Sequence, residues 1–220
     1  MFLHGYLSSG NSFVYQTKFF SRDFEVFAPD LKGFGENIDM KTPYSLDDYI
    51  DEVGEYIYKN SLNNPYIVAH SFGGRIAIKG IATKKIQAKK LVLTGSAGLK
   101  PKNSIKKIYK KACFNFLKHF LSKQKLERFY SKDYLALNDI MKQSFIKIVN
   151  EHLDGYLQSV LVPTLIINGN LDKETPLYMA KKLNKNIKNS TLIVMQGCGH
   201  FCFIDKPNKF NVEVKEFLLS

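Results

Sequence analysis

The sequence predicts an α/β fold in which a mostly parallel sheet carries helices on both faces and one helical insertion interrupts the pattern. Short runs of β-branched and aliphatic residues alternate with helix-like segments along most of the chain. Strand followed by helix, repeated, is typical of parallel sheets covered on both faces. Between Lys100 and about Val160 only helical periodicity remains. We therefore expect a core formed by residues 1–99 and 161–220, and a helical cap formed by residues 100–160.

The elements of this core are predicted from local patterns. Strand character is found in Phe24–Ala28, Pro65–Ala69, Lys90–Leu93, Thr164–Asn168 and Thr191–Met195. Helix-like segments are found at about Ser12–Phe20, Ser45–Asn60, Gly73–Thr83, Pro176–Asn184 and Pro207–Leu218. Asp47 and Asp48 follow Ser45 and suit the positive end of a helix dipole. Pro176 and Pro207 suit a first helical turn.

The predicted cap contains two amphipathic patterns. Apolar side chains recur at i, i+3 and i+4 between Ile105 and Leu121, and lysines occupy the other face. A second helical pattern runs through Asp139–Leu153. We interpret the segment as a cap packed on the core. A basic amphipathic surface that meets anionic membranes is the alternative, and the two are compatible.

Composition excludes several classes of protein. The 220 residues are 45% hydrophobic and 24% charged, which is ordinary for one globular domain with an insertion. No run approaches the 18 apolar residues of a membrane span, and the first residues have neither the basic nor the apolar region of a secretory signal. The cysteines are odd in number and sparse, which argues against a disulfide framework: Cys113, Cys198 and Cys202. We expect a cytoplasmic protein.

The net charge of +12 is unevenly distributed and dominated by lysine. Thirteen Lys or Arg residues and four Asp or Glu residues lie between Lys100 and Leu153. Arginine occurs only as Arg22, Arg75 and Arg128. Base recognition and bidentate phosphate contacts favour arginine, so we expect no nucleic-acid partner.

The first candidate site is a serine on a tight turn. A strand-like run ends at Ser71 and a helix-like run begins at once, which would expose the serine Oγ above the sheet. Such a turn needs small residues two positions before and after the serine because its backbone is crowded. Gly73 supplies one, and Ala69 replaces the usual glycine of the G-x-S-x-G pattern. The alternative role for Ser71 is to cap the following helix.

Two further turns carry an acid and a histidine. His200 lies between Gly199 and Phe201, directly after the last strand-like run, and could instead be a packing or surface residue. Asp172 follows the Thr164–Asn168 run and could be an ordinary turn residue. Glu174 lies nearby and competes with it as the functional acid.

A glycine-containing turn near the N-terminus completes the set. His4 and Gly5 precede Tyr6, and such a turn can direct backbone N–H groups at a developing oxyanion. The order along the chain is this turn, then Ser71, the acid and the histidine. Because the carboxyl ends of parallel strands share one edge of a sheet, we expect these groups to meet there.

This order of turns resembles the α/β-hydrolase superfamily over essentially the whole chain. The Asp30–Gly35 loop is similar to the D-x-x-G-x-G turn of that superfamily. The resemblance implies an α/β-hydrolase fold with Ser71 as nucleophile, His200 as general base and then acid, and Asp172 as the residue that orients His200. It also implies oxyanion donors, assigned to the backbone N–H groups of Tyr6 and Phe72. Asp205 is similar to the acidic residue before the final helix and is interpreted as structural.

No metal or cofactor is predicted. The Cys198-x-His200-x-Cys202 spacing is tighter than usual zinc pairs, and no second ligand pair is evident. The Gly33-x-Gly35 pair is followed by no helix with a third glycine, so it is not a dinucleotide fingerprint.

The N-terminus departs from the superfamily pattern. Similar proteins carry two strands and most of a third before the His-Gly turn, and here only Met1–Leu3 precedes it. Such a short strand would leave neighbouring backbone groups unpaired. We favour a start codon assigned too late; a genuine truncation and an exchange with another chain are the alternatives.

The predicted activity is hydrolysis of a small carboxylic ester or related acyl compound through an acyl-enzyme at Ser71. A lyase is the second hypothesis, because the Ser71–Arg75 run is similar to the menaquinone-pathway synthase that eliminates pyruvate. There the arginine matching Arg75 helps bind substrate carboxylates, but the cap arginines of those enzymes have only Arg128 as a counterpart. Carbon–carbon bond hydrolysis uses the same groups, and a non-catalytic binding protein is a third hypothesis. The sequence determines neither the substrate nor the oligomeric state.

Overall fold

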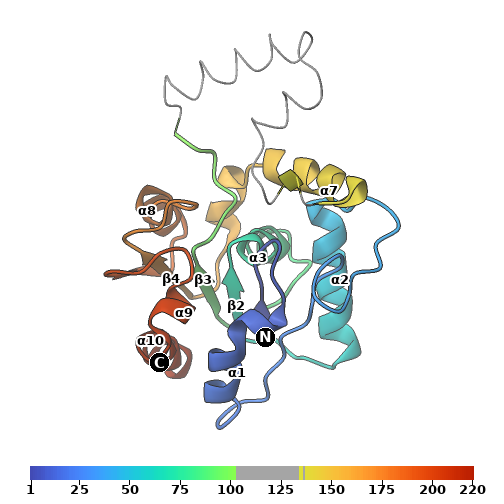
Figure 1. Cartoon of the computed structure of the whole chain (residues 1–220). Coiled ribbons are helices and arrows are strands. Elements are labelled where there is room, and N and C mark those ends of the chain that lie inside the picture. Colours follow the sequence, from blue (N-terminus) through green and yellow to red (C-terminus); the bar gives the residue numbers. More distant parts are fainter. Residues whose placement is uncertain (103–133, 136) are drawn as a thin grey trace.

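A five-stranded parallel sheet organises the molecule, as the alternating pattern predicts (Figure 1). The computed structural model describes residues 1–102, 134, 135 and 137–220. Within them the strands follow one another in the sheet in chain order, and every neighbouring pair is parallel. Their bounds are β1 (Phe2–Leu3), β2 (Ile67–His70), β3 (Leu91–Thr94), β4 (Thr164–Gly169) and β5 (Ser190–Met195). The carboxyl ends of all five strands therefore lie along one edge of the sheet.

Helices cover both faces of the sheet. They are η1 (Gly10–Phe13), α1 (Val14–Phe20), α2 (Leu46–Lys59), α3 (Phe72–Ala82), α7 (Asp139–Asn150), η2 (Asp154–Ser159), α8 (Leu177–Asn186), α9 (Cys202–Asp205) and α10 (Pro207–Leu219). One hydrophobic cluster joins the sheet to α2, α3, α7 and α8. The other joins it to α1, α9 and α10, which lie near both chain ends in Figure 1.

The strands distribute their side chains between these two clusters by strict alternation. Ile67 and Ala69 belong to the first cluster, and Val68 between them belongs to the second. Strand side chains point alternately to opposite faces, so both sets must be apolar when both faces are covered. This requirement explains why the strand-like runs are continuously hydrophobic.

Local signals set the helix starts. Ser45 caps α2 through a capping box, because its Oγ accepts from the Asp48 N–H while the Asp48 carboxylate accepts from the Ser45 N–H. Pro207 is the first residue of α10, as predicted. Pro176 differs from the prediction, because it is the N-cap of α8 and has an extended ψ of 151°.

Four of the five predicted strands are confirmed to within two residues, but Phe24–Ala28 forms no strand. The segment is extended next to β1 and accepts one backbone hydrogen bond, from Phe2 N to Phe27 O, at 2.8 Å. The strand β1 has only two residues and offers Phe24–Ala28 too few backbone groups for a regular ladder of hydrogen bonds. The apolar character of Phe24–Ala28 therefore reflects packing against α1 and the sheet rather than regular strand pairing.

Part of the predicted cap lies outside the described residues, including the Ile105–Leu121 pattern and its lysines. The second pattern forms α7 over Asp139–Asn150, and Met141 and Ile148 pack into the core cluster. Tyr44 N donates a hydrogen bond to Ser144 Oγ, and Lys147 Nζ donates one to Pro43 O, so α7 lies beside the start of α2 (Figure 1). No helix within the described ranges has the length and apolar character needed to span a membrane.

Candidate active site

Ser71 occupies a strained turn between β2 and α3. Its φ of 50° and ψ of −105° lie in a region that residues other than glycine rarely adopt. Three backbone bonds of 3.1 Å hold it there: Ser71 N donates to Thr94 O, and Ser71 O accepts from the N–H groups of Gly74 and Ala97. Gly73 is required by crowding, because a Cβ there would lie 2.3 Å from Leu3 O. The turn leaves the Ser71 side chain partly exposed.

Two backbone N–H groups are free beside this turn. Neither Phe72 N nor Tyr6 N has an acceptor within the described part of the chain. Phe72 opens α3, where the helix dipole favours negative charge. The turn that carries Tyr6 is attached to α3, since Gly73 N donates to His4 O at 3.0 Å. This arrangement suits an anion that forms next to Ser71.

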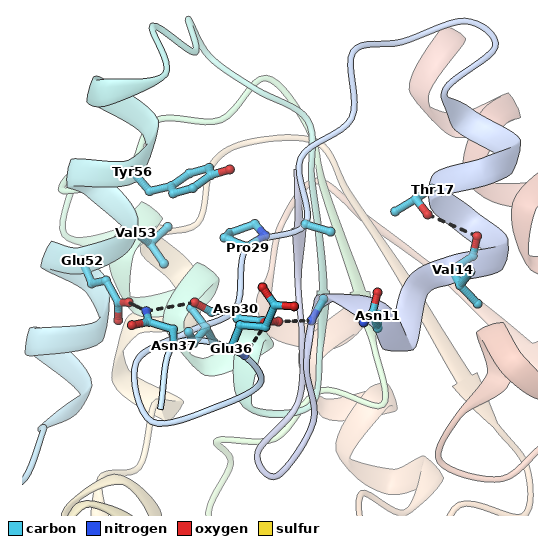
Figure 2. A pocket seen from close by; sticks show the side chains of 13 residues that line it. Asn11, Val14, Thr17, Pro29, Asp30, Glu36, Asn37, Glu52, Val53 and Tyr56 are labelled. Carbon is cyan, nitrogen blue, oxygen red and sulfur yellow. Dashed lines mark hydrogen bonds between the residues drawn. The ribbon is translucent and has the colours of Figure 1, made fainter. Parts of the chain in front are cut away.

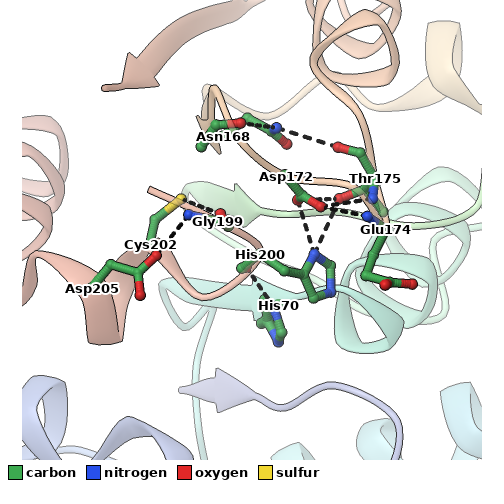
Figure 3. A network of polar contacts seen from close by, with 10 residues as sticks. His70, Asn168, Asp172, Glu174, Thr175, Gly199, His200, Cys202 and Asp205 are labelled. Carbon is green, nitrogen blue, oxygen red and sulfur yellow. Dashed lines mark hydrogen bonds and ion pairs between the residues drawn. The ribbon is translucent and has the colours of Figure 1, made fainter. Parts of the chain in front are cut away.

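His200 is paired with Asp172 across two loops at the same edge (Figure 3). His200 Nδ1 lies 2.9 Å from Asp172 Oδ2. Asp172 is buried, and its Oδ1 accepts from the N–H groups of Glu174 and Thr175 at 2.8 and 2.9 Å. Thr175 Oγ1 donates to Asp172 Oδ2 at 2.7 Å. These bonds hold the carboxylate in a fixed orientation toward the histidine.

The electrostatics of Asp172 favour its charged form. Burial acts to raise the pKa of this carboxyl, but the hydrogen bonds from His200 and Thr175 outweigh burial and hold the pKa below its ordinary value. An ionised Asp172 accepts a hydrogen bond from His200 Nδ1–H, so the proton of the neutral ring lies on Nδ1. The other ring nitrogen, Nε2, is then the basic one.

The structure brings Ser71 and His200 to the same sheet edge without a direct bond. No hydrogen bond joins Ser71 Oγ to the His200 ring among the described residues. The two are linked through the neighbour of Ser71, because His70 Nε2 donates to His200 O at 3.1 Å and the two imidazole rings are 4.6 Å apart. Catalytic hydrogen bonds are often long in unliganded enzymes and shorten when substrate binds.

Glu174 and Arg75 have other contacts. Glu174 is exposed and contributes its backbone N–H rather than its carboxylate to the Asp172 loop. Arg75 is buried, and its Nη1 donates to Ile148 O and Glu151 O, both at 2.8 Å. Burial lowers its pKa to about 10, and Glu151 opposes this effect. Arg75 also lines a cavity of about 650 Å³ beside the Asp172 loop.

The loop that carries His200 is fixed by its own bonds. Gly199 N donates to Asp205 Oδ2 at 2.7 Å, which agrees with a structural role for Asp205. Cys198 and Cys202 are buried thiols, and Cys202 Sγ lies 3.4 Å from Gly199 O. Among the residues that the structure describes, no group of three His, Cys, Asp or Glu side chains could hold a metal ion.

The sequence pattern predicted no role for two polar residues of this network, Thr175 and His70. Thr175 bonds Asp172 through both its backbone and its side chain. An Asp followed by residues whose N–H groups return to it is an Asx-type turn, which was the available signal. His70 is buried in the structure. In the sequence it ends an apolar run directly before the candidate nucleophile, and a polar residue in that place was the available signal.

Comparison with known proteins identifies the family of this chain. A model of the alpha/beta hydrolase family matches residues 1–213. The chain belongs to the α/β-hydrolase family. This α/β-hydrolase is 27% identical to the AB hydrolase superfamily protein YisY of Bacillus subtilis, over 99% of this chain and 90% of that protein.

Solved structures show the same fold for this α/β-hydrolase. An esterase from Exiguobacterium antarcticum is 25% identical with a TM-score of 0.79, covering 100% of this chain and 91% of that chain. A meta-cleavage product hydrolase from Pseudomonas fluorescens is 22% identical with a TM-score of 0.74, covering 99% and 89%. The predicted superfamily and fold class are thereby confirmed, and family membership makes the protein a hydrolase.

Proposed function

We propose that this α/β-hydrolase is a serine hydrolase that cleaves a small carboxylic ester or related acyl compound. The observation that carries the proposal is the arrangement at the sheet edge. A strained Ser71 turn, two free backbone N–H groups and a His200–Asp172 pair lie at the ends of neighbouring parallel strands. These are the parts that acyl transfer requires.

Each group has a role in the proposed reaction. His200 Nε2 takes the proton from Ser71 Oγ as the oxygen attacks the acyl carbon, and Asp172 stabilises the imidazolium that forms. The N–H groups of Phe72 and Tyr6 bind the oxyanion of the tetrahedral intermediate. The imidazolium then protonates the leaving alcohol. Water, activated by the same histidine, releases the acyl group from Ser71.

The relatives favour ester hydrolysis over elimination. The esterase from Exiguobacterium antarcticum aligns with the whole of this chain. The pyruvate-eliminating lyase hypothesis needs Arg75 for a substrate carboxylate, but the Arg75 Nη1 group is bonded to two backbone carbonyls of the cap. Carbon–carbon hydrolysis stays an alternative, because the same Ser, His and Asp groups serve both reactions.

Labelling with a fluorophosphonate tests the proposal, because this probe reports an activated serine without a known substrate. We expect covalent modification at Ser71, mapped by mass spectrometry of the modified peptide. Ser71→Ala should abolish the labelling, and His200→Ala should lower its rate by at least about 10³-fold. The matched control is Ser21→Ala, an exposed serine at the C-cap of α1, which should label like the wild type. A folded wild-type protein that stays unmodified at Ser71 would contradict the proposal.

A further inference from the structure

We propose that His70 is a positioning residue that holds the His200 loop in register with the nucleophile turn, as a permanently neutral imidazole protonated on Nε2. The inference rests on the proposed function, since it concerns the same Ser71 and His200. His70 is the last residue of β2 and immediately precedes Ser71. The residue is 1% exposed, so its imidazole is enclosed by protein.

The hydrogen bond of His70 determines its tautomer. Its Nε2 lies 3.1 Å from the backbone carbonyl oxygen of His200 (Figure 3). A carbonyl oxygen can only accept, so Nε2 must carry the proton. His70 is thus covalently attached to Ser71, the proposed nucleophile, and hydrogen-bonded to the backbone of His200, the proposed base.

Ring contacts fix the plane of this imidazole. The His70 ring lies 4.6 Å from the His200 ring, 4.9 Å from Phe201 and 5.0 Å from Phe203, in tilted or edge-on geometry. The rings of His200 and of two phenylalanines that follow it therefore pack on His70. Removing the ring would release the loop from the nucleophile turn rather than open an isolated cavity.

The surroundings keep His70 uncharged. Burial, which has the largest effect, and the nearby His200 together lower its pKa to about 3. His4 acts in the same direction, while Asp172 and the hydrogen bond to His200 O act against it. When His200 becomes an imidazolium during the reaction, a neutral neighbour adds no second positive charge beside it. The tautomer of His70 can therefore stay the same through the whole cycle.

The other ring nitrogen faces the oxyanion turn. His70 Nδ1 is buried and has no hydrogen-bond partner within the described residues. It lies 2.9 Å from the position that a Cβ at Gly5 would take, and Ser71 Cβ lies 3.4 Å from the same point. The imidazole thus fills the space between the His4–Tyr6 turn and the His200 loop. It places all three parts of the site relative to one another.

Two substitutions separate the hydrogen bond from the packing. His70→Leu introduces an apolar side chain of similar size that has no hydrogen-bond donor. We expect kcat for nitrophenyl esters and the fluorophosphonate labelling rate to fall about 10- to 100-fold, with KM within about threefold of the wild-type value. His70→Gln places an amide N–H near the same carbonyl and should restore both to within about fivefold of wild type. Phe210→Leu is the matched control, because it removes a buried ring of the same cluster that makes no ring contact with His70 within the described residues, and it should leave both rates nearly unchanged.

A measurement on the unaltered protein covers the case in which His70→Leu does not fold. Nitrogen-15 NMR of the histidine rings should show one imidazole protonated only on Nε2 from pH 5 to 9, without titration. A His70 ring that titrates in this range, or that is protonated on Nδ1, overturns the inference. So does a folded His70→Leu variant that labels at the wild-type rate, or a His70→Gln variant that loses as much activity as His70→Leu. An unlabelled wild type overturns the proposed function itself, and the inference with it.

Discussion

At the scale of single residues, the acid at the site is selected by backbone geometry. Asp172 and Glu174 are two positions apart and follow the same strand. The loop turns back so that Asp172 accepts from two N–H groups and one hydroxyl, and its Oδ2 lies 2.9 Å from His200. Glu174 projects outward and is exposed. Asp172 and Glu174 carry the same chemical group, but only the Asp172 carboxylate reaches His200.

The pair Asp172→Asn and Glu174→Gln tests this assignment. Asp172→Asn should lower kcat about 10³- to 10⁴-fold, because an amide favours the wrong tautomer of His200 and leaves the imidazolium unstabilised. Glu174→Gln should change kcat by no more than about twofold. The measurement is steady-state hydrolysis of a nitrophenyl ester, with the labelling rate at Ser71 as a second readout. Loss of activity in Glu174→Gln alone would mean that the other carboxylate orients the histidine.

At the scale of elements, α1 and α2 enclose a cavity of about 670 Å³ over the extended Ala28–Leu31 segment (Figure 2). Glu52 on α2 points into it and accepts from Lys32 N at 3.0 Å and from Asn37 Nδ2 at 3.2 Å. Burial raises the pKa of Glu52 to about 7, against these hydrogen bonds and the nearby Lys32 charge. The folded chain is therefore less stable when the Glu52 carboxyl group in the cavity wall is ionised than when it is protonated.

This raised pKa predicts a pH-dependent stability. Glu52 binds its proton more tightly in the folded chain, where its pKa is about 7, than in the unfolded chain, where its ordinary pKa is 4.5. The free energy of unfolding therefore falls as the pH rises from about 4.5 to about 7. Glu52→Gln removes the charge and should flatten this fall. At pH 8 we expect a gain of about 1 kcal/mol, discounted for solvent in the cavity, or roughly 2–4 °C in Tm.

Thermal unfolding from pH 4.5 to 8 measures the effect. Asp51→Asn is the matched control on the same helix, because Asp51 forms an exposed pair with Lys85 and should leave the slope with pH unchanged. Parallel pH profiles for wild type and Glu52→Gln would contradict the prediction.

At the scale of the whole molecule, a polar network around two buried cations of α3 joins this helix to the end of α7 and to α2. Arg75 and Lys79 project from α3. Arg75 bonds the carbonyls of Ile148 and Glu151 at the end of α7, and Lys79 Nζ lies 2.6 Å from Glu151 Oε1 and 2.8 Å from Asp47 Oδ2. Burial alone would lower the pKa of Lys79, but the hydrogen bonds to Asp47 and Glu151 outweigh it and raise the pKa. Helix α3, which follows the Ser71 turn, thus holds the end of α7 and α2 together.

Arg75→Met tests whether Arg75 acts on the fold or on substrate. The substitution leaves two carbonyls without their charged donor and should cost about 2–4 kcal/mol of unfolding free energy, measured by urea denaturation. Lys59→Met, in an exposed pair, should cost less than about 1 kcal/mol. KM for an acidic ester relative to a neutral ester should stay the same. A selective rise in KM for the acidic ester, with stability unchanged, would instead indicate that Arg75 binds a substrate carboxylate.

The sequence by itself determined the fold class, most element positions and the chain order of the site turns. These depend on local patterns: apolar runs of strand length, helical periodicity, and turn residues next to them. The same local rules failed at Phe24–Ala28, where the run is apolar but only one backbone bond joins it to the short β1. Strand formation needs a partner strand, which a local pattern does not supply.

Only the tertiary structure decided which groups meet. It paired Asp172 rather than Glu174 with His200, and it bonded Arg75 to two backbone carbonyls at the end of α7. It also bonded Thr175 to Asp172 and His70 to the backbone of His200. His70 and His200 are 130 positions apart in the sequence and share a 3.1 Å hydrogen bond. Such contacts depend on how loops from different strands converge at the sheet edge. That convergence is set by the packing of the entire core, so no single segment encodes it.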